Sequence, residues 1–225
     1  MFWVRLVIVA LYAVPALCTV LAAKCLGGNG IVVGTDSLEA HGGTVENRFS
    51  EKLVRINPLT LVCMAASNSD VRSLCNELRR ICLMHKADCD ELLGVDSLAH
   101  AARQLVHSSF PEAHVLIVGC SSSAKLDIHE ILPGGSHIEN QDVAVAGSGS
   151  AMVVTLIQEL WESARRSDQP LSKSNATLIS DSPAATAARI KKAMQAVIRS
   201  DAGSGGKVAL WSLSMKGERV EIAKL

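Results

Sequence analysis

Large aromatic side chains are scarce in this sequence: Phe, Trp and Tyr together make up 3% of the 225 residues, whereas apolar residues as a group make up 48%. Because few rings are available, the core must be built mainly from Ala, Val, Leu and Ile. Such small side chains suit closely packed layers or a large subunit interface, and an alanine-rich helical surface is the alternative explanation. The length fits one domain with a sizeable core.

An excess of charge of either sign is also absent. Lys and Arg together number 22, as do Asp and Glu, so the formal net charge is zero. Proteins that bind nucleic acid or anionic membranes usually carry a strongly basic surface. We therefore expect no nucleic-acid partner and no membrane partner.

Paired cysteine motifs are missing as well. The seven cysteines include no CxxC pair, and an odd number argues against a complete disulfide framework. We expect reduced, structural thiols in a cytosolic protein. His100, His107 and His114 repeat at intervals of seven, but Pro111 would interrupt a helix through them, and no Cys or carboxylate lies at a ligand-like spacing. We therefore expect no metal and no cofactor.

The N-terminal segment is strongly apolar from Leu6 to Leu17 and has small residues up to Ala23, as a signal peptide would. Thr19–Leu26 also has the pattern of a first strand, and cleavage after Ala23 would remove half of it. Residues 1–18 are interpreted as a hydrophobic propeptide-like extension or a gene-model artefact, with a signal peptide as the alternative. Residues 19–225 then form one domain.

The hydrophobic periodicity follows the order strands, two helices, strands, two helices, strands. Two sheets packed face to face, each covered outside by a helix pair, would bury every apolar stripe, which predicts an α+β fold, a four-layer αββα sandwich. The predicted strands are Val20–Leu26, Ile31–Asp36, Lys52–Ile56, Leu59–Ala65, Ala113–Cys120, Lys125–Leu132, Val143–Ala146, Lys207–Leu213 and Arg219–Ile222. Four helices are predicted: one that begins after a cap at Ser67 or Ser69, one over Asp96–Ser108, one that runs through Met152 to Arg166, and one from Pro183 to Arg199.

Common catalytic motifs are not found: the sequence has no GxSxG, HExxH, P-loop or GxGxxG. The glycine-rich segment Gly147–Ser150 carries Ser148 but no histidine to act as its base. The remaining candidates for chemistry are scattered residues with hydroxyl, carboxylate or amine groups: Thr19, Asp36, Lys52, Ser148, Asp201 and Ser204.

Short segments in a fixed order along the chain carry a resemblance to a known family. They are Gly34–Ser37, Asn47-Arg48, Lys52-Leu53, Ile56–Pro58, Met64–Ala66, Gly147–Ser150 and Arg199–Gly206. Any one of them is a weak signal, but their order and spacing together resemble the β-type subunits of the 20S proteasome, from about Thr19 to Leu225. The resemblance implies the Ntn-hydrolase sandwich.

The resemblance also implies an activity, that of a threonine-type endopeptidase. Such a subunit would assemble with α and β subunits into stacked heptameric rings in the cytoplasm and nucleus, and degrade unfolded polypeptides inside the chamber. Cleavage between Cys18 and Thr19 would free an α-amino group to act as base for the Thr19 hydroxyl. The alternative is a catalytically inactive, structural β subunit of the same particle.

The other candidate residues take their roles from the same resemblance. Lys52 matches the buried lysine that activates the hydroxyl, Asp36 matches the carboxylate that holds this lysine, and Ser148, Asp201 and Ser204 match the polar set around the α-amino group.

Four further positions match the oxyanion and substrate-binding residues, namely Ala40, Met64, Ala66 and Asn68. The Ala66 amide would donate to the oxyanion, and Met64 in the primary pocket would favour large apolar residues before the scissile bond.

The sequence departs from the family at several of these places. Cys18 precedes Thr19 where glycine is usual, Leu38 and Ala40 stand where arginine and threonine are common, and Ala66 replaces a glycine. The opening hairpin is also longer than usual. Counted back from the acidic residue, the nucleophile position falls on Val20 without a loop insertion, and on Thr19 if an extra residue lies in the loop at 27–30. We adopt Thr19 because loop tips tolerate insertions better than strands do.

Overall fold

The computed structural model describes residues 18–41, 44–121, 123–139, 141–168, 181–216 and 219–225. The strands in chain order are β1 (Thr19–Cys25), β2 (Gly30–Thr35), β3 (Glu39–His41), β4 (Thr44–Asn47), β5 (Leu53–Asn57), β6 (Thr60–Ala65), β7 (His114–Cys120), β8 (Leu126–Ile131), β9 (His137–Ile138), β10 (Val143–Gly147), β11 (Ala209–Lys216) and β12 (Arg219–Lys224). The helices are α1 (Asn68–Cys89), α2 (Val95–Ser109), α3 (Ser150–Asp168) and α4 (Pro183–Ser200), with short 3-10 turns at Leu26–Gly28 and Pro133–Gly135.

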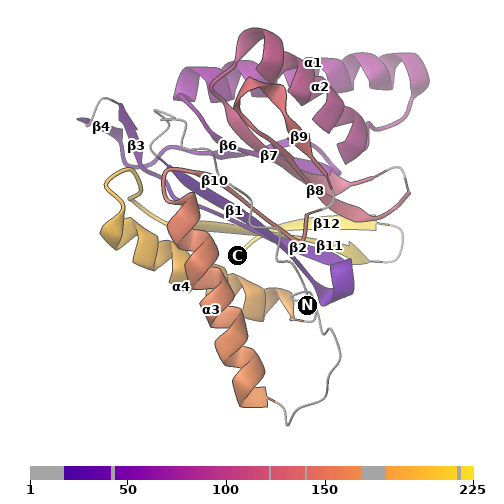
Figure 1. Cartoon of the computed structure of the whole chain (residues 1–225). Helices are drawn as coiled ribbons and strands as arrows, with labels where there is room; N and C mark the ends of the chain where they lie inside the picture. The colour runs from indigo at the N-terminus through magenta and orange to yellow at the C-terminus, as the bar shows by residue number, and fades with distance from the viewer. Residues whose placement is uncertain (1–17, 42–43, 122, 140, 169–180, 217–218) are drawn as a thin grey trace.

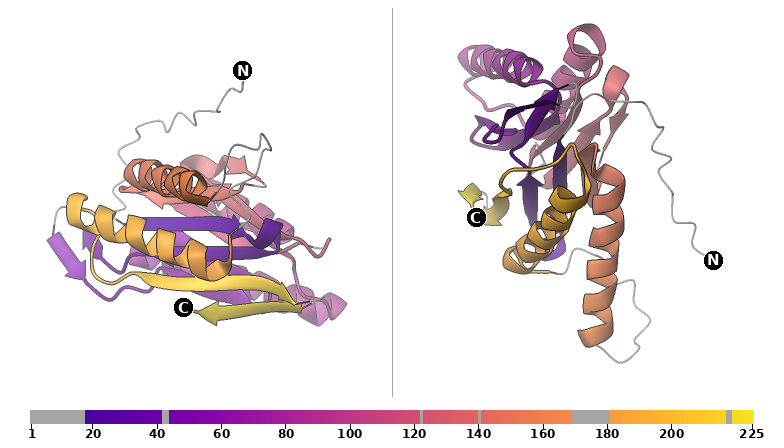
Figure 2. Two further views of the ribbon diagram at one scale, coloured as in Figure 1. Left: turned by 90° about the horizontal axis from the view of Figure 1, so that it is seen from below. Right: turned by 90° about the vertical axis from the view of Figure 1, so that its left-hand side faces the viewer.

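Two antiparallel five-stranded sheets lie face to face between two helix pairs (Figures 1 and 2). One sheet has the order β10-β1-β2-β11-β12 and is covered by α3 and α4; the other has the order β5-β6-β7-β8-β9 and is covered by α1 and α2. The predicted four-layer αββα sandwich is confirmed.

The first strand of the chain shows how the layers are filled. Side chains alternate across a strand, and in β1 Val20 and Ala22 pack in the apolar layer between the sheets, whereas Leu21 and Ala23 pack against α3 and α4. Because both faces of this sheet are covered, β1 is apolar from Val20 to Ala23, and its residues from 19 to 23 are all fully buried.

The helix boundaries agree with the signals in the sequence. The Ser67 side chain accepts a hydrogen bond from the Asp70 amide at the start of α1, and Pro183 lies in the first turn of α4. The sequence did not predict β3, β4 and β9, which are two to four residues long and too short to show a period.

The predicted N-terminal extension, residues 1–18, lies outside the described residues except for Cys18. This cysteine is buried and leads directly into β1, so the described part of the chain starts inside the fold. None of the helices among the described residues is long and apolar enough to cross a membrane.

All seven cysteines are free thiols, as predicted, and most are buried. Burial raises the pKa of Cys18 to about 12 and that of Cys25 and Cys75 to about 11, and it also raises the pKa of Cys63. A buried thiol therefore stays protonated at pH values where the same thiol in the unfolded chain ionises.

This difference predicts an alkaline loss of stability. Above about pH 9 the unfolded state binds fewer protons than the folded state, so the free energy of unfolding falls as the pH rises toward the folded pKa. Replacing Cys63 by Ala removes one such thiol. We expect the decline between pH 9 and 11 to become shallower by about 1.4 kcal/mol per pH unit, measured by urea unfolding at a series of pH values. An unchanged slope would contradict the assignment of Cys63 as a buried, protonated thiol.

Candidate active site

The site is organised around Asp36, a fully buried carboxylate directly after β2. Its Oδ1 accepts hydrogen bonds from the Lys52 Nζ at 2.6 Å and from the Thr19 amide at 3.0 Å, and its Oδ2 accepts one from the Gly205 amide at 2.8 Å. Lys52, just before β5, is only 6% exposed. Burying two charges is costly unless they are paired and hydrogen-bonded, and here both conditions are met.

A second carboxylate, Asp201 at the end of α4, gathers the hydroxyl groups of the site. Its Oδ2 accepts hydrogen bonds from the Ser148 and Ser204 hydroxyls, each at 2.7 Å. The Thr19 Oγ1 lies 2.5 Å from the Ser204 Oγ. Because the Ser204 proton is directed at Asp201, the Thr19 hydroxyl is the donor to Ser204. Thr19, Ser204 and Asp201 thus form a hydrogen-bonded relay that ends on the Asp201 carboxylate.

The start of β1 is held by β10. Thr19 pairs with Gly147, and the Cys18 carbonyl accepts a hydrogen bond from the Ser148 amide at 2.9 Å. Gly147 has a positive φ of 101°, and a Cβ there would overlap the Cys18 carbonyl oxygen. A Cβ on Gly149 would likewise overlap the Thr19 hydroxyl. Glycine is therefore required for this close approach.

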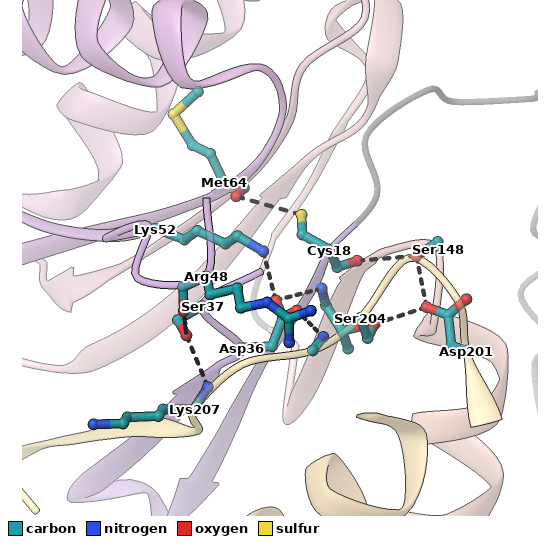
Figure 3. A network of polar contacts seen from close by, with 12 residues as sticks. Cys18, Asp36, Ser37, Arg48, Lys52, Met64, Ser148, Asp201, Ser204 and Lys207 are labelled. Carbon is teal, nitrogen blue, oxygen red and sulfur yellow. Dashed lines mark hydrogen bonds and ion pairs between the residues drawn. The ribbon is translucent and has the colours of Figure 1, made fainter. Parts of the chain in front are cut away.

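The Cys18 sulfur lies on the opposite side of the strand from the hydroxyl relay (Figure 3). Its Sγ is 3.9 Å from the Met64 carbonyl oxygen. Burial raises the pKa of the Cys18 thiol to about 12; the Lys52 charge and the Ala66 backbone act to lower it, and the Asp36 and Asp201 charges act to raise it. The thiol therefore lies within electrostatic range of a buried cation as well as of two carboxylates.

The structure brings together all six residues predicted to carry chemistry. Asp36 joins Thr19 to Lys52, and Asp201 joins Ser148 to Ser204 and, through it, to Thr19. The sequence did not single out Cys18 as part of this cluster. The alternation along β1 is the signal that could have found it, because residue 18 must face the same side as Val20.

The four predicted oxyanion and substrate-binding residues are less closely grouped. Met64 meets the site through its carbonyl, while its side chain is 1% exposed and packs beneath α1 and α2. Ala66 contributes backbone next to the Cys18 sulfur. Ala40 lies in β3, and Asn68 is the first residue of α1. The role of Met64 in substrate preference remains a prediction.

One group of metal-ligand type occurs among the described residues, away from this site on β8 and β9. His129, His137 and Glu139 place their ligand atoms within 4.8 Å of one another, and the two imidazoles are 3.0 Å apart between Nδ1 of His129 and Nε2 of His137. Two imidazoles and a carboxylate are the donor types of zinc sites. The spacing of histidines in the sequence pointed to His100, His107 and His114 and not to this group.

Comparison with known proteins agrees with the geometry. The family model described as "Proteasome subunit" matches residues 18–178. The chain is 24% identical to the "Probable proteasome subunit beta type-1" of Encephalitozoon cuniculi over 88% of each chain. It is 24% identical to proteasome subunit beta type-6 of Arabidopsis thaliana over 84% of this chain and 74% of the relative, and 23% identical to proteasome subunit beta type-1 of Saccharomyces cerevisiae over 84% and 80%. The chain belongs to the proteasome subunit family, as a β-type member.

Proposed function

We propose that this β-type subunit of the 20S proteasome core is itself an endopeptidase, cleaving unfolded polypeptides with a nucleophile at the start of β1 that is freed by self-processing. The observation that carries the proposal is the buried Lys52–Asp36 pair at 2.6 Å beside that strand. An ion pair in a core contributes little to stability compared with apolar residues of the same size. Its position next to nucleophilic groups supports a catalytic use.

The pair would act electrostatically. A fixed ammonium group lowers the free energy of negative charge that develops on a hydroxyl or thiol as it loses its proton. The α-amino group released by processing, with an ordinary pKa of about 7.7–8.0, would accept that proton near neutral pH. Thr19 is the hydroxyl that the resemblance assigns, and its bond to Ser204 gives it a fixed orientation. Before processing, the nitrogen is an amide and the subunit is inert.

A structural, inactive subunit is the second candidate, and it is favoured by the burial of the strand start. Thr19 is 0% and Cys18 2% exposed, so in this form no peptide reaches either side chain. Ala66 stands where the family has glycine, and it adds a Cβ beside the start of β1. Whether active or inactive, the subunit would belong to the same ring particle, with α and β subunits as partners, in the cytoplasm and nucleus.

Assembly gives a first test that both candidates share. Phe49, Leu83 and Met84 are 72%, 70% and 54% exposed, so apolar side chains are available for contact with neighbouring subunits. We expect the chain alone to self-associate or precipitate, and to co-sediment in a stacked-ring particle when expressed with homologous α and β subunits. Analytical ultracentrifugation measures both. A stable monomer that never enters the particle would contradict a ring function.

Activity is tested on the assembled particle by intact mass and by labelling with a peptide vinyl sulfone, an electrophile that alkylates a hydroxyl or a thiol nucleophile. We expect a subunit shortened by its first 17 or 18 residues and modified once, at its new first residue. Fluorogenic peptides with a large apolar residue before the scissile bond should be hydrolysed faster than acidic ones. An uncut, unmodified subunit would establish the inactive alternative.

A further inference from the structure

The two residues at the start of β1 point to opposite faces of their sheet. Thr19 faces the loop after α4, where its hydroxyl is bonded to Ser204 and enclosed by Gly149. Cys18 packs with Val20 in the apolar layer between the two sheets. Because neighbouring side chains on a strand alternate, only one of the two can share a face with the lysine ammonium.

That residue is Cys18. Its sulfur is next to the Met64 carbonyl at the end of β6 and interacts with the Ala66 backbone that follows it. The Lys52 ammonium makes one hydrogen bond, to Asp36, within the described part of the chain. A lysine ammonium has three protons to donate, so this group has further capacity to stabilise a negative charge nearby. Figure 3 shows the Cys18 sulfur and the Lys52 amine directed toward the same space.

We infer that Cys18, rather than Thr19, is the nucleophile, and that the mature chain begins at Cys18 after cleavage of the Leu17–Cys18 bond. This deepens the proposed function and rests on it. Groups of the kind that a nucleophilic attack uses lie on one side of β1, namely the Cys18 sulfur, the Lys52 ammonium and the backbone at the end of β6.

Self-cleavage then proceeds as an acyl shift from nitrogen to sulfur. The Cys18 sulfur bonds to the carbonyl carbon of residue 17, the carbon–nitrogen bond between residues 17 and 18 breaks, and the thiol proton moves to the nitrogen. This leaves residues 1–17 as a thioester on a chain with a free α-amine. Water hydrolyses the thioester, which releases residues 1–17 with a carboxylate and restores the thiol.

Peptide hydrolysis repeats these steps on a substrate. The sulfur attacks the scissile carbonyl, and its proton passes through the Cys18 α-amine to the departing amine. The acyl group remains on sulfur until water attacks it, and the proton lost by water returns to the thiol. No oxidant or cofactor takes part in either step.

Thr19 is a positioning residue in this scheme. Its amide donates to Asp36, its carbonyl accepts from the Asp36 amide at 3.1 Å, and its hydroxyl donates to Ser204. These bonds fix the backbone on one side of Cys18, and the Ser148 amide fixes the carbonyl of Cys18 itself. The thiol is therefore held toward Lys52 by neighbours that do not react.

The test uses the full-length chain assembled with its partner subunits. We expect a mature mass that lacks residues 1–17, a first residue of Cys18, and an adduct with 2-cyanobenzothiazole, which condenses only with a thiol and an amine on adjacent carbons. Cys18→Ala should remain uncut and lose peptide hydrolysis by at least about a hundredfold. Cys18→Ser, which keeps a weaker nucleophile, should still be cut after residue 17, but more slowly.

Cys25→Ala is the matched control, because Cys25 is a buried thiol on the same strand with a raised pKa, remote from Lys52. This variant should be processed and should hydrolyse peptides as the parent does. A mature chain that begins at Thr19 and hydrolyses peptides overturns the assignment of Cys18 and leaves the proposed function standing. An uncut chain without hydrolysis overturns both. Cleavage at residue 17 in Cys18→Ala also overturns the assignment.

Discussion

Replacing Lys52 by Met together with Asp36 by Asn is expected to abolish self-processing and, with it, to lower peptide hydrolysis by at least about 10²-fold, while the folded subunit and the ring persist. The double variant removes both charges of the buried pair and keeps side chains of similar volume. The double variant leaves no buried charge without a partner, although Asn at position 36 can accept from only one of the two backbone amides, of Thr19 and Gly205, that Asp36 binds. The stability of the double variant is therefore measured beside its activity, so that loss of the ammonium is separated from unfolding.

The single change Lys52→Met separates the two effects. It leaves Asp36 buried without a counter-ion, so we expect a loss of about 3–5 kcal/mol in the free energy of unfolding. Urea unfolding measures the stability of both variants, and the mass of the assembled subunit measures processing. If the double variant matures and hydrolyses peptides at near-normal rates, the pair is structural and the catalytic proposal fails.

A second lysine–aspartate pair supplies the control. Lys24 in β1 and Asp127 in β8 are 3.0 Å apart with side chains 11% and 14% exposed, so they form another largely buried bond between the two sheets. Lys24→Met should lower stability without changing processing, because this pair lies at the other end of β1. Equal losses of activity in Lys24→Met and Lys52→Met would point to a general effect on the sandwich.

The sequence predicted the layers well because two simple periods describe them. Continuous apolar runs such as Ala113–Cys120 belong to strands covered on both faces, and the stripe from Val71 to Cys82 belongs to a helix covered on one face. These patterns depend on local burial alone. The polar hairpin β3–β4 has no such stripe, and its pairing depends on tertiary contacts that a local pattern does not record.

The structure brings the six predicted residues of the site together, but the sequence did not show in which direction β1 presents its first side chains. Counted back from Asp36, the nucleophile position falls on Thr19 only if the opening hairpin holds one extra residue. In the structure this connection contains a 3-10 turn at Leu26–Gly28, with three consecutive residues at positive φ, and β1 ends by pairing Cys25 with Gly30. A loop of that shape absorbs residues without moving the strand, so counting along the chain cannot decide between Cys18 and Thr19. The register of β1 against β10, which pairs Thr19 with Gly147, fixes the face of the sheet that each of the two residues presents.

The close approach of β10 to β1 gives a second large expected effect on stability. Gly147→Ala places a Cβ on a residue with φ of 101° and against the carbonyl oxygen of Cys18. We expect the free energy of unfolding to fall by about 4 kcal/mol, since strained backbone and a backbone clash act together. We also expect processing to stop, because the strand start moves away from Ser148. Urea unfolding and intact mass measure the two effects.

Gly134→Ala separates the strain from the clash. Gly134 lies in the 3-10 turn after β8 with φ of 82°, and a Cβ there would meet nothing within 4 Å. The Gly134→Ala variant therefore loses stability through its positive φ alone, and we expect its free energy of unfolding to fall by about 1–2 kcal/mol. The loss in the free energy of unfolding that Gly147→Ala shows beyond that of Gly134→Ala measures the cost of the clash between a Cβ at position 147 and the Cys18 carbonyl. If the two variants lose equal stability, β10 can retreat from β1 at no cost, and the backbone is not what holds Cys18 against Lys52.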